Sequence, residues 1–337
     1  MTATYARSAG DTVTSASYAV TATLSPSGVL DNYNIIYNNA PFTITKRNAV
    51  VSPNSATKVY GATHPALTGS RSGFLAADGV TATYTRVAGE TVAGGPYASS
   101  ATLSPVAVLG NYNVTYNTAP FTITPATPAI VWNPAAAVYG APLGAAQLNA
   151  TTTIPGTWTY TPAAGTVLTA GAHILSVSFT PGDNSDYTTA TQTATIKVQY
   201  SLNACLGDLG HSVLQPVNAN STSTFKQGST VPVKFRVCYA NGNSVGSAGI
   251  VSAFNLVSIL NGTVTQTVDD TVASTTPDSM FRWDPTAQQW IFNISTKPLA
   301  VGRTYVYAIA LNDGSTILFQ YGLEIANLWR NWSFRAC

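Results

Sequence analysis

The sequence carries two copies of one long motif, and this duplication constrains the fold more than any other feature. Residues 32–45 read Asn-Tyr-Asn-Ile-Ile-Tyr-Asn-Asn-Ala-Pro-Phe-Thr-Ile-Thr, and residues 111–124 read Asn-Tyr-Asn-Val-Thr-Tyr-Asn-Thr-Ala-Pro-Phe-Thr-Ile-Thr. The matching residues around Tyr33 and Tyr112 are the same number of positions apart as these two tyrosines, so the two copies align without a gap. We call this interval the repeat offset. A repeat of this kind predicts a chain built from serial modules.

Apolar and polar residues alternate in two short runs of this motif. The first run covers residues 112–116 and the second covers residues 121–124, with the period expected of half-buried strands. Phe121 lies an odd number of positions after Tyr116, so one uninterrupted strand would place the two apolar sets on opposite faces. A turn over residues 117–120 restores them to one face, because Asn tolerates turn conformations and Pro closes the turn. The motif therefore predicts a β-hairpin.

The composition favours strands throughout the chain. Charged residues make up 8% of the 337 residues and apolar residues 45%, a balance typical of strands whose outward faces carry Thr, Ser and Asn. The formal net charge is +2, and the longest basic run is the pair Lys46-Arg47, so the sequence offers no electrostatic surface for nucleic acid. No apolar run has the length of a membrane span. We therefore expect an all-β protein that neither binds nucleic acid nor inserts into a membrane.

The first copy of the repeat is incomplete. Residues 2–7 (Thr-Ala-Thr-Tyr-Ala-Arg) align at the repeat offset with residues 81–86 (Thr-Ala-Thr-Tyr-Thr-Arg), so residues 1–46 match only the second half of the unit over residues 47–125. The N-terminus also lacks the basic start and apolar core of a signal peptide. We expect the chain to be the C-terminal part of a longer protein whose signal peptide lies upstream. We also expect residues 1–46 to be less ordered than residues 47–125, or to pair with another chain through an exposed edge.

A third, diverged unit follows over residues 126–199. Ala-Val-Tyr-Gly at residues 137–140 repeats the Lys-Val-Tyr-Gly of residues 58–61, again at the repeat offset. The first two units resemble the MBG repeat of large bacterial surface proteins, which has a Tyr-Gly near its start and an Asn-Tyr-x-Val-Thr-Tyr … Phe-Thr-Ile ending. The third resembles a bacterial immunoglobulin-like module, through Ala-Gly-Ala-His at residues 170–173 and a later Asp-Tyr. The resemblance implies extracellular β-modules and no particular activity.

The character of the sequence changes near residue 200. Residues 225–237 contain Pro-Val-Lys-Phe, residues 281–284 read Phe-Arg-Trp-Asp, and together they resemble the bacterial PxKF domain. That resemblance implies a secreted β-sandwich at the end of surface proteins. Asp313-Gly314 between two alternating runs independently predicts a hairpin, and the general pattern predicts two facing antiparallel sheets. We expect serial small β-modules followed by a larger sandwich over residues 200–325, with residues 326–337 as a tail outside every pattern.

Three cysteines bear on the C-terminal domain. Cys205 and Cys238 flank its first strands, and we predict that they form a disulfide; the alternative is a pair of reduced, buried thiols. A bridge closing a loop of this size stabilises a fold by about 3–4 kcal/mol. Cys337 is left unpaired by count.

Candidate catalytic and metal-binding residues are few. His64, His173 and His211 fall in three different modules and in no metal-binding spacing, and there is no Gly-x-Ser-x-Gly elbow. Only Asp208, near His211, offers a histidine an acidic partner in its own unit. The chain has two glutamates, in different domains, so a carboxylate pair for glycoside hydrolysis would have to include its aspartates. Oxygen ligands for calcium occur at residues 183–186 and at Asp269-Asp270, although Asx-type turns explain them as well.

We therefore predict a non-enzymatic stalk or spacer of a bacterial cell-surface or secreted protein, without a cofactor and without an obligate oligomer. The alternative is an adhesin or glycan-binding module acting through the C-terminal sandwich, whose partner would be a host or surface glycan or protein. Its aromatic platform would come from Trp283, Trp290, Tyr305 and Tyr307.

Overall fold

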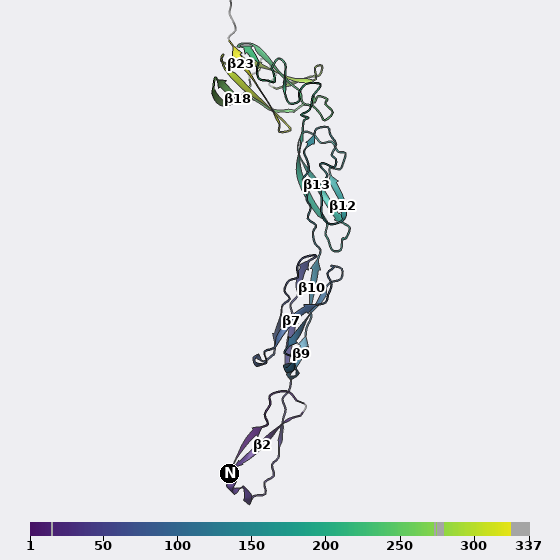
Figure 1. Ribbon diagram of the computed structural model, residues 1–337, viewed down its shortest axis with the longest axis vertical. Coiled ribbons are helices and arrows are strands. Elements are labelled where there is room, and N and C mark those ends of the chain that lie inside the picture. Colours follow the sequence, from purple (N-terminus) through teal and green to yellow (C-terminus); the bar gives the residue numbers. More distant parts are fainter. Residues whose placement is uncertain (15, 273, 275–279, 325–337) are drawn as a thin grey trace, which may run out of the picture. The chain divides into compact units, whose positions relative to one another are not determined.

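The computed structural model describes residues 1–14, 16–272, 274 and 280–324, and it confirms an all-β protein (Figure 1). Two compact units result: one comprises Met1–Pro128 with Pro181–Thr189, the other Ala129–Thr180 with the chain from Ala190 onward. The predicted tail, 326–337, and Cys337 lie outside the described residues. We call residues 1–46 the first module, residues 47–125 the second, residues 126–199 the third and residues 200–325 the C-terminal sandwich.

The first module contains one antiparallel sheet in the order β1-β2-β3. Its strands are β1 (Thr2–Arg7), β2 (Tyr18–Ser25) and β3 (Ala40–Phe42), with the short 3₁₀ helix η1 (Ser27–Asn32) between β2 and β3. Residues 33–37 follow η1 without strand structure.

The second module has two sheets. One has the order β6-β4-β9, from β4 (Arg47–Pro53), β6 (Gly69–Ser72) and β9 (Tyr112–Tyr116). The other has the order β5-β10-β8-β7, from β5 (Ala56–Val59), β7 (Thr81–Arg86), β8 (Tyr97–Ser104) and β10 (Ala119–Thr124). Two 3₁₀ helices complete the module, η2 (Ala76–Asp78) and η3 (Val106–Asn111).

The predicted hairpin of the repeated motif is wrong. The two alternating runs do form strands, β9 and β10, but each lies in a different sheet. The strand β9 pairs in parallel with β4, whereas β10 lies between β8 and β5. The predicted turn over residues 117–120 is also wrong, because only Asn117 and Thr118 link the two strands and carry the chain from one sheet to the other. Strands in facing sheets can bury their apolar residues in one core without pairing with each other. A sandwich therefore lets β9 and β10 direct apolar residues to one core without forming a hairpin.

Apolar residues from both sheets form the interior of the second module. Val51 of β4 packs with Val80 and with Leu103 of β8, and a second cluster contains Tyr97, Phe121 and Ile123. Phe121 and Val51 have no exposed surface. The alternation thus identified the buried side of β10, whereas in β9 Tyr112 is buried but Tyr116 is 52% exposed.

The third module has one four-stranded sheet in the order β11-β14-β13-β12. Its strands are β11 (Ala137–Val138), β12 (Gly156–Thr161), β13 (Gly171–Pro181) and β14 (Ala190–Gln199). The long antiparallel pair of β13 and β14 buries Leu175, Val177 and Ile196 together with Trp132.

The C-terminal sandwich consists of a four-stranded and a five-stranded sheet. The first has the order β15-β17-β21-β20, from β15 (Val213–Leu214), β17 (Thr230–Phe235), β20 (Arg282–Asp284) and β21 (Gln289–Ser295). The second has the order β16-β23-β22-β18-β19, from β16 (Thr224–Lys226), β18 (Val251–Asn261), β19 (Val264–Thr271), β22 (Thr304–Leu311) and β23 (Thr316–Glu324). The predicted hairpin at Asp313-Gly314 is confirmed, because Ala310 pairs with Thr316 across it.

Candidate functional site: contacts at the module junctions

One contact between consecutive modules occurs twice with equivalent atoms. The backbone N–H of Val13, in the loop after β1, donates a hydrogen bond of 2.9 Å to Oδ1 of Asn111. The backbone N–H of Val92, which matches Val13 at the repeat offset and lies in the loop after β7, donates a hydrogen bond of 2.7 Å to Oδ1 of Asp186. Both acceptors immediately precede a tyrosine of the Asn/Asp-Tyr motif. The repeated motif therefore supplies an acceptor for the loop of the module before it.

The segment that carries Asp186 is held by its own hydrogen bonds. Oδ1 of Asp183 accepts the backbone N–H groups of Ser185 and Asp186 at 3.0 and 3.1 Å, which is an Asx-type turn. The backbone of Asp186 also bonds to Ala126 at 2.9 Å. Asp186 is 5% exposed, and a buried carboxylate requires donors of this kind.

Several of the carboxylate oxygens that the sequence offers for calcium accept hydrogen bonds from protein donors. Oxygens of Asp183 and Asp186 accept backbone N–H groups, and Oδ1 of Asp269 accepts the Asn255 amide at 2.7 Å. Among the described residues, no three or more His, Cys, Asp or Glu side chains are grouped so that they could hold a metal ion. The Asx-turn alternative describes what residues 183–186 do here.

The tyrosines of the repeated Val-Tyr-Gly sequence also lie at junctions. The ring of Tyr60 meets that of Tyr187 edge to face, with centroids 5.3 Å apart. The carboxylate of Asp186, aided by burial, raises the pKa of Tyr60. Its counterpart Tyr139 has its ring centroid 4.7 Å from that of Tyr239 in the C-terminal sandwich. The sequence marked both tyrosines as a repeat signature, but nothing in it showed that they contact another module.

Further polar contacts join the third module to the C-terminal sandwich. The carbonyl of Tyr139 accepts the N–H of Ala240 at 2.8 Å. Tyr200, which follows β14, donates its N–H to Oδ2 of Asp313 at 2.9 Å and its hydroxyl to Oδ1 of Asn312 at 2.7 Å. The predicted Asn-Asp-Gly turn is therefore also a docking point for Tyr200, with which the C-terminal sandwich begins directly after β14. Burial and the nearby Asp313 carboxylate raise the pKa of Tyr200.

His211 lies beside this docking point. Its Nε2 is 3.0 Å from Oγ of Ser315 and 3.9 Å from Oδ2 of Asp313, whereas Asp208 pairs with Arg236 instead. Burial lowers the pKa of His211. The Ser315 hydroxyl donates to Asp313, and both groups face the same ring nitrogen. A nucleophilic triad needs the carboxylate on the other nitrogen, so these three groups are not arranged as a triad.

The remaining histidines serve local contacts. His64 lies in an ion cluster in which Glu90 meets Lys58 at 2.5 Å and His64 at 2.9 Å and also pairs with Arg86. The hydrogen bond from Lys58 is the main cause that lowers the pKa of Glu90 to about 2. His173 contacts the carbonyl of Thr169 at 2.7 Å. The three histidines are therefore not brought together.

Cys205 and Cys238 are joined by a disulfide, with their Cα atoms 5.6 Å apart. Both cysteines have no exposed surface. Cys238 lies shortly after β17 and Cys205 lies in the loop before β15, so the bridge ties the irregular start of the sandwich to its sheet.

Three of the four aromatic residues of the alternative glycan platform are buried. Tyr305 and Tyr307 are 2% and 1% exposed, and Tyr307 shares a hydrogen bond of 2.9 Å with the Tyr321 hydroxyl. Trp290 is buried and donates its ring N–H to the carbonyl of Val245. Trp283 is only half-buried and packs on Trp290 with centroids 5.4 Å apart. Strands of a sandwich point alternate residues into the core, and Trp290, Tyr305 and Tyr307 lie there, so the four candidates include no pair of solvent-facing rings.

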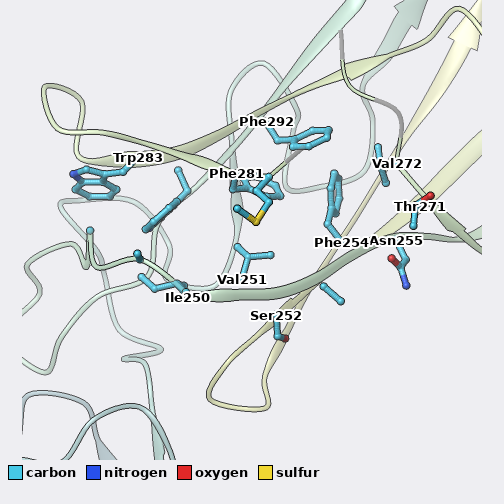
Figure 2. Close-up of a pocket in the computed structure, with 16 residues that line it drawn as sticks. Ile250, Val251, Ser252, Phe254, Asn255, Thr271, Val272, Phe281, Trp283 and Phe292 are labelled. Carbon is cyan, nitrogen blue, oxygen red and sulfur yellow. The ribbon is translucent and has the colours of Figure 1, made fainter. Parts of the chain in front are cut away.

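An apolar pocket of about 690 Å³ opens between the two sheets of the C-terminal sandwich (Figure 2). The rings of Phe254, Phe281 and Phe292 face it, with centroids 5.0 to 5.3 Å apart. Among the described residues that line the pocket, none is a charged side chain that would orient a polar ligand.

Comparison with known families identifies one module. A family model described as MBG domain (YGX type) matches residues 49–122, inside the second module. No curated protein matches the chain. Within the described residues, no helix is both long enough and apolar enough to cross a membrane.

Solved structures of serial β-modules are similar at low TM-scores. The I9–I11 tandem from titin is 11% identical with a TM-score of 0.25, covering 84% of this chain and 98% of that chain. Three N-terminal domains of the bacteriophage RB49 Highly Immunogenic Outer Capsid protein are 13% identical with a TM-score of 0.28, covering 77% and 93%. The S-layer protein rSbsC is 10% identical with a TM-score of 0.23, covering 94% of this chain and 46% of that chain. Scores this low carry no inference, and the fold rests on the strands described above.

Proposed function

We propose that this chain is a non-catalytic spacer of a bacterial cell-surface or secreted protein. The observation that carries the proposal is the recurrent junction contact, in which Val13 and Val92, one repeat apart, bond to Asn111 and Asp186. A spacer needs its modules to be coupled, because modules on free linkers move independently. The same contact at two successive junctions links each of the first two modules to the module that follows it.

The strength of such a junction follows from its parts. A hydrogen bond contributes about 1 kcal/mol, and one to a charged group about 1.5–3 kcal/mol. The edge-to-face pair of Tyr60 and Tyr187 adds roughly 0.5–1.5 kcal/mol. These contributions restrict bending at the junction without making it rigid.

Family evidence supports the cellular setting. The MBG match at residues 49–122 agrees with the resemblance of the first two modules to repeats of large bacterial surface proteins. Residues 232–235, Pro-Val-Lys-Phe, support a PxKF-type domain at the C-terminal end. In the second module and the C-terminal sandwich, the clustered ionisable groups (Glu90, Asp208 and Asp313) are engaged in structural contacts, which supports a non-enzymatic role.

Relaxation measurements by NMR on the full chain test this role. Asn111→Ala and Asp186→Ala should each remove one junction hydrogen bond and make the neighbouring modules tumble more independently. Asn32→Ala is the matched control, because Asn32 is the same motif residue in the first module and is exposed. Wild-type modules that already tumble independently, or junction variants that behave like Asn32→Ala, would exclude a spacer that works through these contacts.

A further inference from the structure

His211 belongs to a small polar network at the start of the C-terminal sandwich. Its Nε2 lies 3.0 Å from Oγ of Ser315, and the Ser315 hydroxyl donates to the Asp313 carboxylate. Because the single hydrogen of that hydroxyl goes to Asp313, the Ser315 oxygen accepts from His211. The neutral ring therefore carries its hydrogen on Nε2 and a lone pair on Nδ1.

The other ring nitrogen is poorly placed to take up a proton. Nδ1 of His211 is buried, and it has no hydrogen-bond partner among the described residues. The side chain as a whole is 9% exposed. A second proton would go to Nδ1 and would bury a charged N–H without an acceptor, which is unfavourable. The site therefore suits the neutral ring and disfavours the imidazolium ion.

The backbone around His211 is itself tightly placed. The residue has a φ of 55°, in the left-handed region that residues other than glycine rarely adopt. At the preceding Gly210, an added Cβ would lie 2.9 Å from the carbonyl oxygen of Ser201, so these two segments are in close contact. Charging the ring therefore acts on a packed network and not on a freely rotating side chain.

The same network holds the junction between the third module and the C-terminal sandwich. Oδ2 of Asp313 accepts the Tyr200 N–H at 2.9 Å and lies 3.9 Å from Nε2 of His211. The ring centroid of Tyr200 is 6.3 Å from that of His211 and 5.8 Å from that of Tyr139 in the third module. The carbonyl of Tyr139 accepts the N–H of Ala240 across the junction. A change at His211 therefore reaches the third module through Tyr200.

We propose that His211 makes this junction sensitive to acid. The neutral ring belongs to the closed junction, in which Tyr200 is bonded to Asp313. Protonation opens the junction, because the charged ring moves toward water and breaks the network of Ser315 and Asp313. This junction is not one of the two that carry the proposed function, so either proposal can fail without the other.

The groups that face His211 determine the direction of the effect. Asp313 is the acidic group beside the ring, whereas Asp208 pairs with Arg236. Burial is the largest effect and lowers the pKa of His211 from its ordinary value of 6.5, although the Asp313 carboxylate and the Ser201 backbone favour the charged ring.

The Tyr200 ring, which also faces His211, stays uncharged where histidine titrates, because burial raises the pKa of Tyr200. In the open state the His211 ring is in water and takes up its proton near pH 6.5. The closed junction should therefore be most stable above this value and lose stability as the pH falls below it.

Hydrogen exchange of the full chain tests the proposal at the amide of Ala240, which bonds across the junction to Tyr139. We expect its protection, corrected for the intrinsic effect of pH on exchange, to fall by up to about 10-fold between about pH 7.5 and about pH 5.5. His211→Gln keeps an N–H donor at the position of Nε2 and does not titrate, so its protection should not change over this range. His173→Gln, a histidine variant in the third module, is the matched control and should behave like the wild type.

Direct titration of the His211 ring by NMR keeps the proposal testable if His211→Gln does not fold. We expect a pKa below 6.5 for this ring and a loss of Ala240 protection that follows its protonation. The proposal is overturned if the ring titrates at or above that value, if acid leaves Ala240 protection unchanged, or if protection falls equally in His211→Gln. Greater protection in acid would also overturn it, because the imidazolium ion would then tighten the junction through Asp313.

Discussion

Phe121 and Phe42 occupy the same position of the repeated motif and differ completely in burial. Phe121 lies in the cluster with Tyr97 and Ile123. The guanidinium carbon of Arg86 lies over its ring, 4.7 Å from the ring centroid. Phe42 keeps the equivalent cation contact with Arg7 at 5.4 Å but has 42% of its surface exposed. The Arg contact is therefore a property of the motif, whereas burial depends on strands outside it.

This difference predicts the cost of truncating each ring. Phe121→Ala should destabilise the second module by about 3–5 kcal/mol, because it empties a fully buried site. Phe42→Ala, the matched control, should cost about 1 kcal/mol or less in the first module. Hydrogen exchange of residues 97–124 in the first variant and residues 18–45 in the second measures the two free energies. Equal losses would mean that the first module has a core of its own.

Glu90 predicts a second residue-level effect, on pH dependence. The hydrogen bond from Lys58, with His64 and Arg86 nearby, lowers the pKa of Glu90 from 4.5 to about 2. The Glu90 carboxylate is therefore protonated near pH 4.5 in the unfolded chain, but only near pH 2 in the folded module. The contribution of Glu90 to the stability of the second module should be fully present above pH 4.5, and it should be lost as the pH falls from 4.5 to about 2.

Thermal unfolding across this acidic range, with neutral pH as the reference, measures the contribution. Glu90→Gln should flatten the pH dependence of the transition of the second module. Glu324→Gln removes the same charge at the end of β23 and serves as the control. A Glu90→Gln profile parallel to that of the wild type would show that Lys58, His64 and Arg86 do not favour the ionised form.

At the scale of elements, parallel pairing decides which parts of the motif become strands. Residues 112–116 form β9 beside β4, while the near-identical residues 33–37 form none. Backbone N–H and C=O groups of an extended segment need partners. For β9 those partners come from a strand far earlier in the sequence, as the pairing of Asn48 with Asn113 illustrates.

Hydrogen exchange of the wild-type chain checks this dependence. Amides in residues 112–116 and 121–124 should exchange about 100-fold or more slowly than those in residues 33–37 and 42–45, because the latter lack the partner strands. The two antiparallel pairs β1–β2 and β7–β8 provide an internal comparison with equal register. Similar protection of both motif copies in a dilute monomer would contradict the dependence.

These elements also show how far the sequence can predict the fold. Asp313-Gly314 located the hairpin between β22 and β23. Alternation located β9 and β10 and the buried side of β10, although Tyr116 of β9 is 52% exposed. It could not assign neighbours: the motif predicted a hairpin, yet β9 and β10 pair with other strands in different sheets. A period of two specifies a buried face, whereas the choice of partner depends on contacts distant in sequence.

The junctions escaped prediction for the same reason. Val92 and Asp186 are far apart in the sequence. Their hydrogen bond uses a backbone N–H, which every residue except proline has, and an aspartate in a turn, which is a common feature of sequences. Burial of Tyr305 and Tyr307 likewise depends on the facing sheet, so their aromatic character could not distinguish a sugar platform from a core.

At the scale of the whole molecule, stabilisation is divided between two units. The first has small clusters around Val51 and Phe121, whereas the second contains the continuous core of the C-terminal sandwich, with Phe235, Tyr307 and Ile309 fully or almost fully buried. Larger buried cores give higher stability. We therefore expect this chain to unfold in a series of separate transitions and not in one event.

The disulfide should affect only one of these transitions. Replacing Cys205 and Cys238 by Ala opens the loop that the bridge closes, which should destabilise the C-terminal sandwich by about 3–4 kcal/mol and lower its transition by roughly 10–15 °C. The second module should be unaffected, because it belongs to the other compact unit. Calorimetry of the full chain, with hydrogen exchange assigning each transition, measures both effects. An unchanged sandwich transition, or alkylation of both cysteines in the unreduced wild type, would contradict a stabilising bridge.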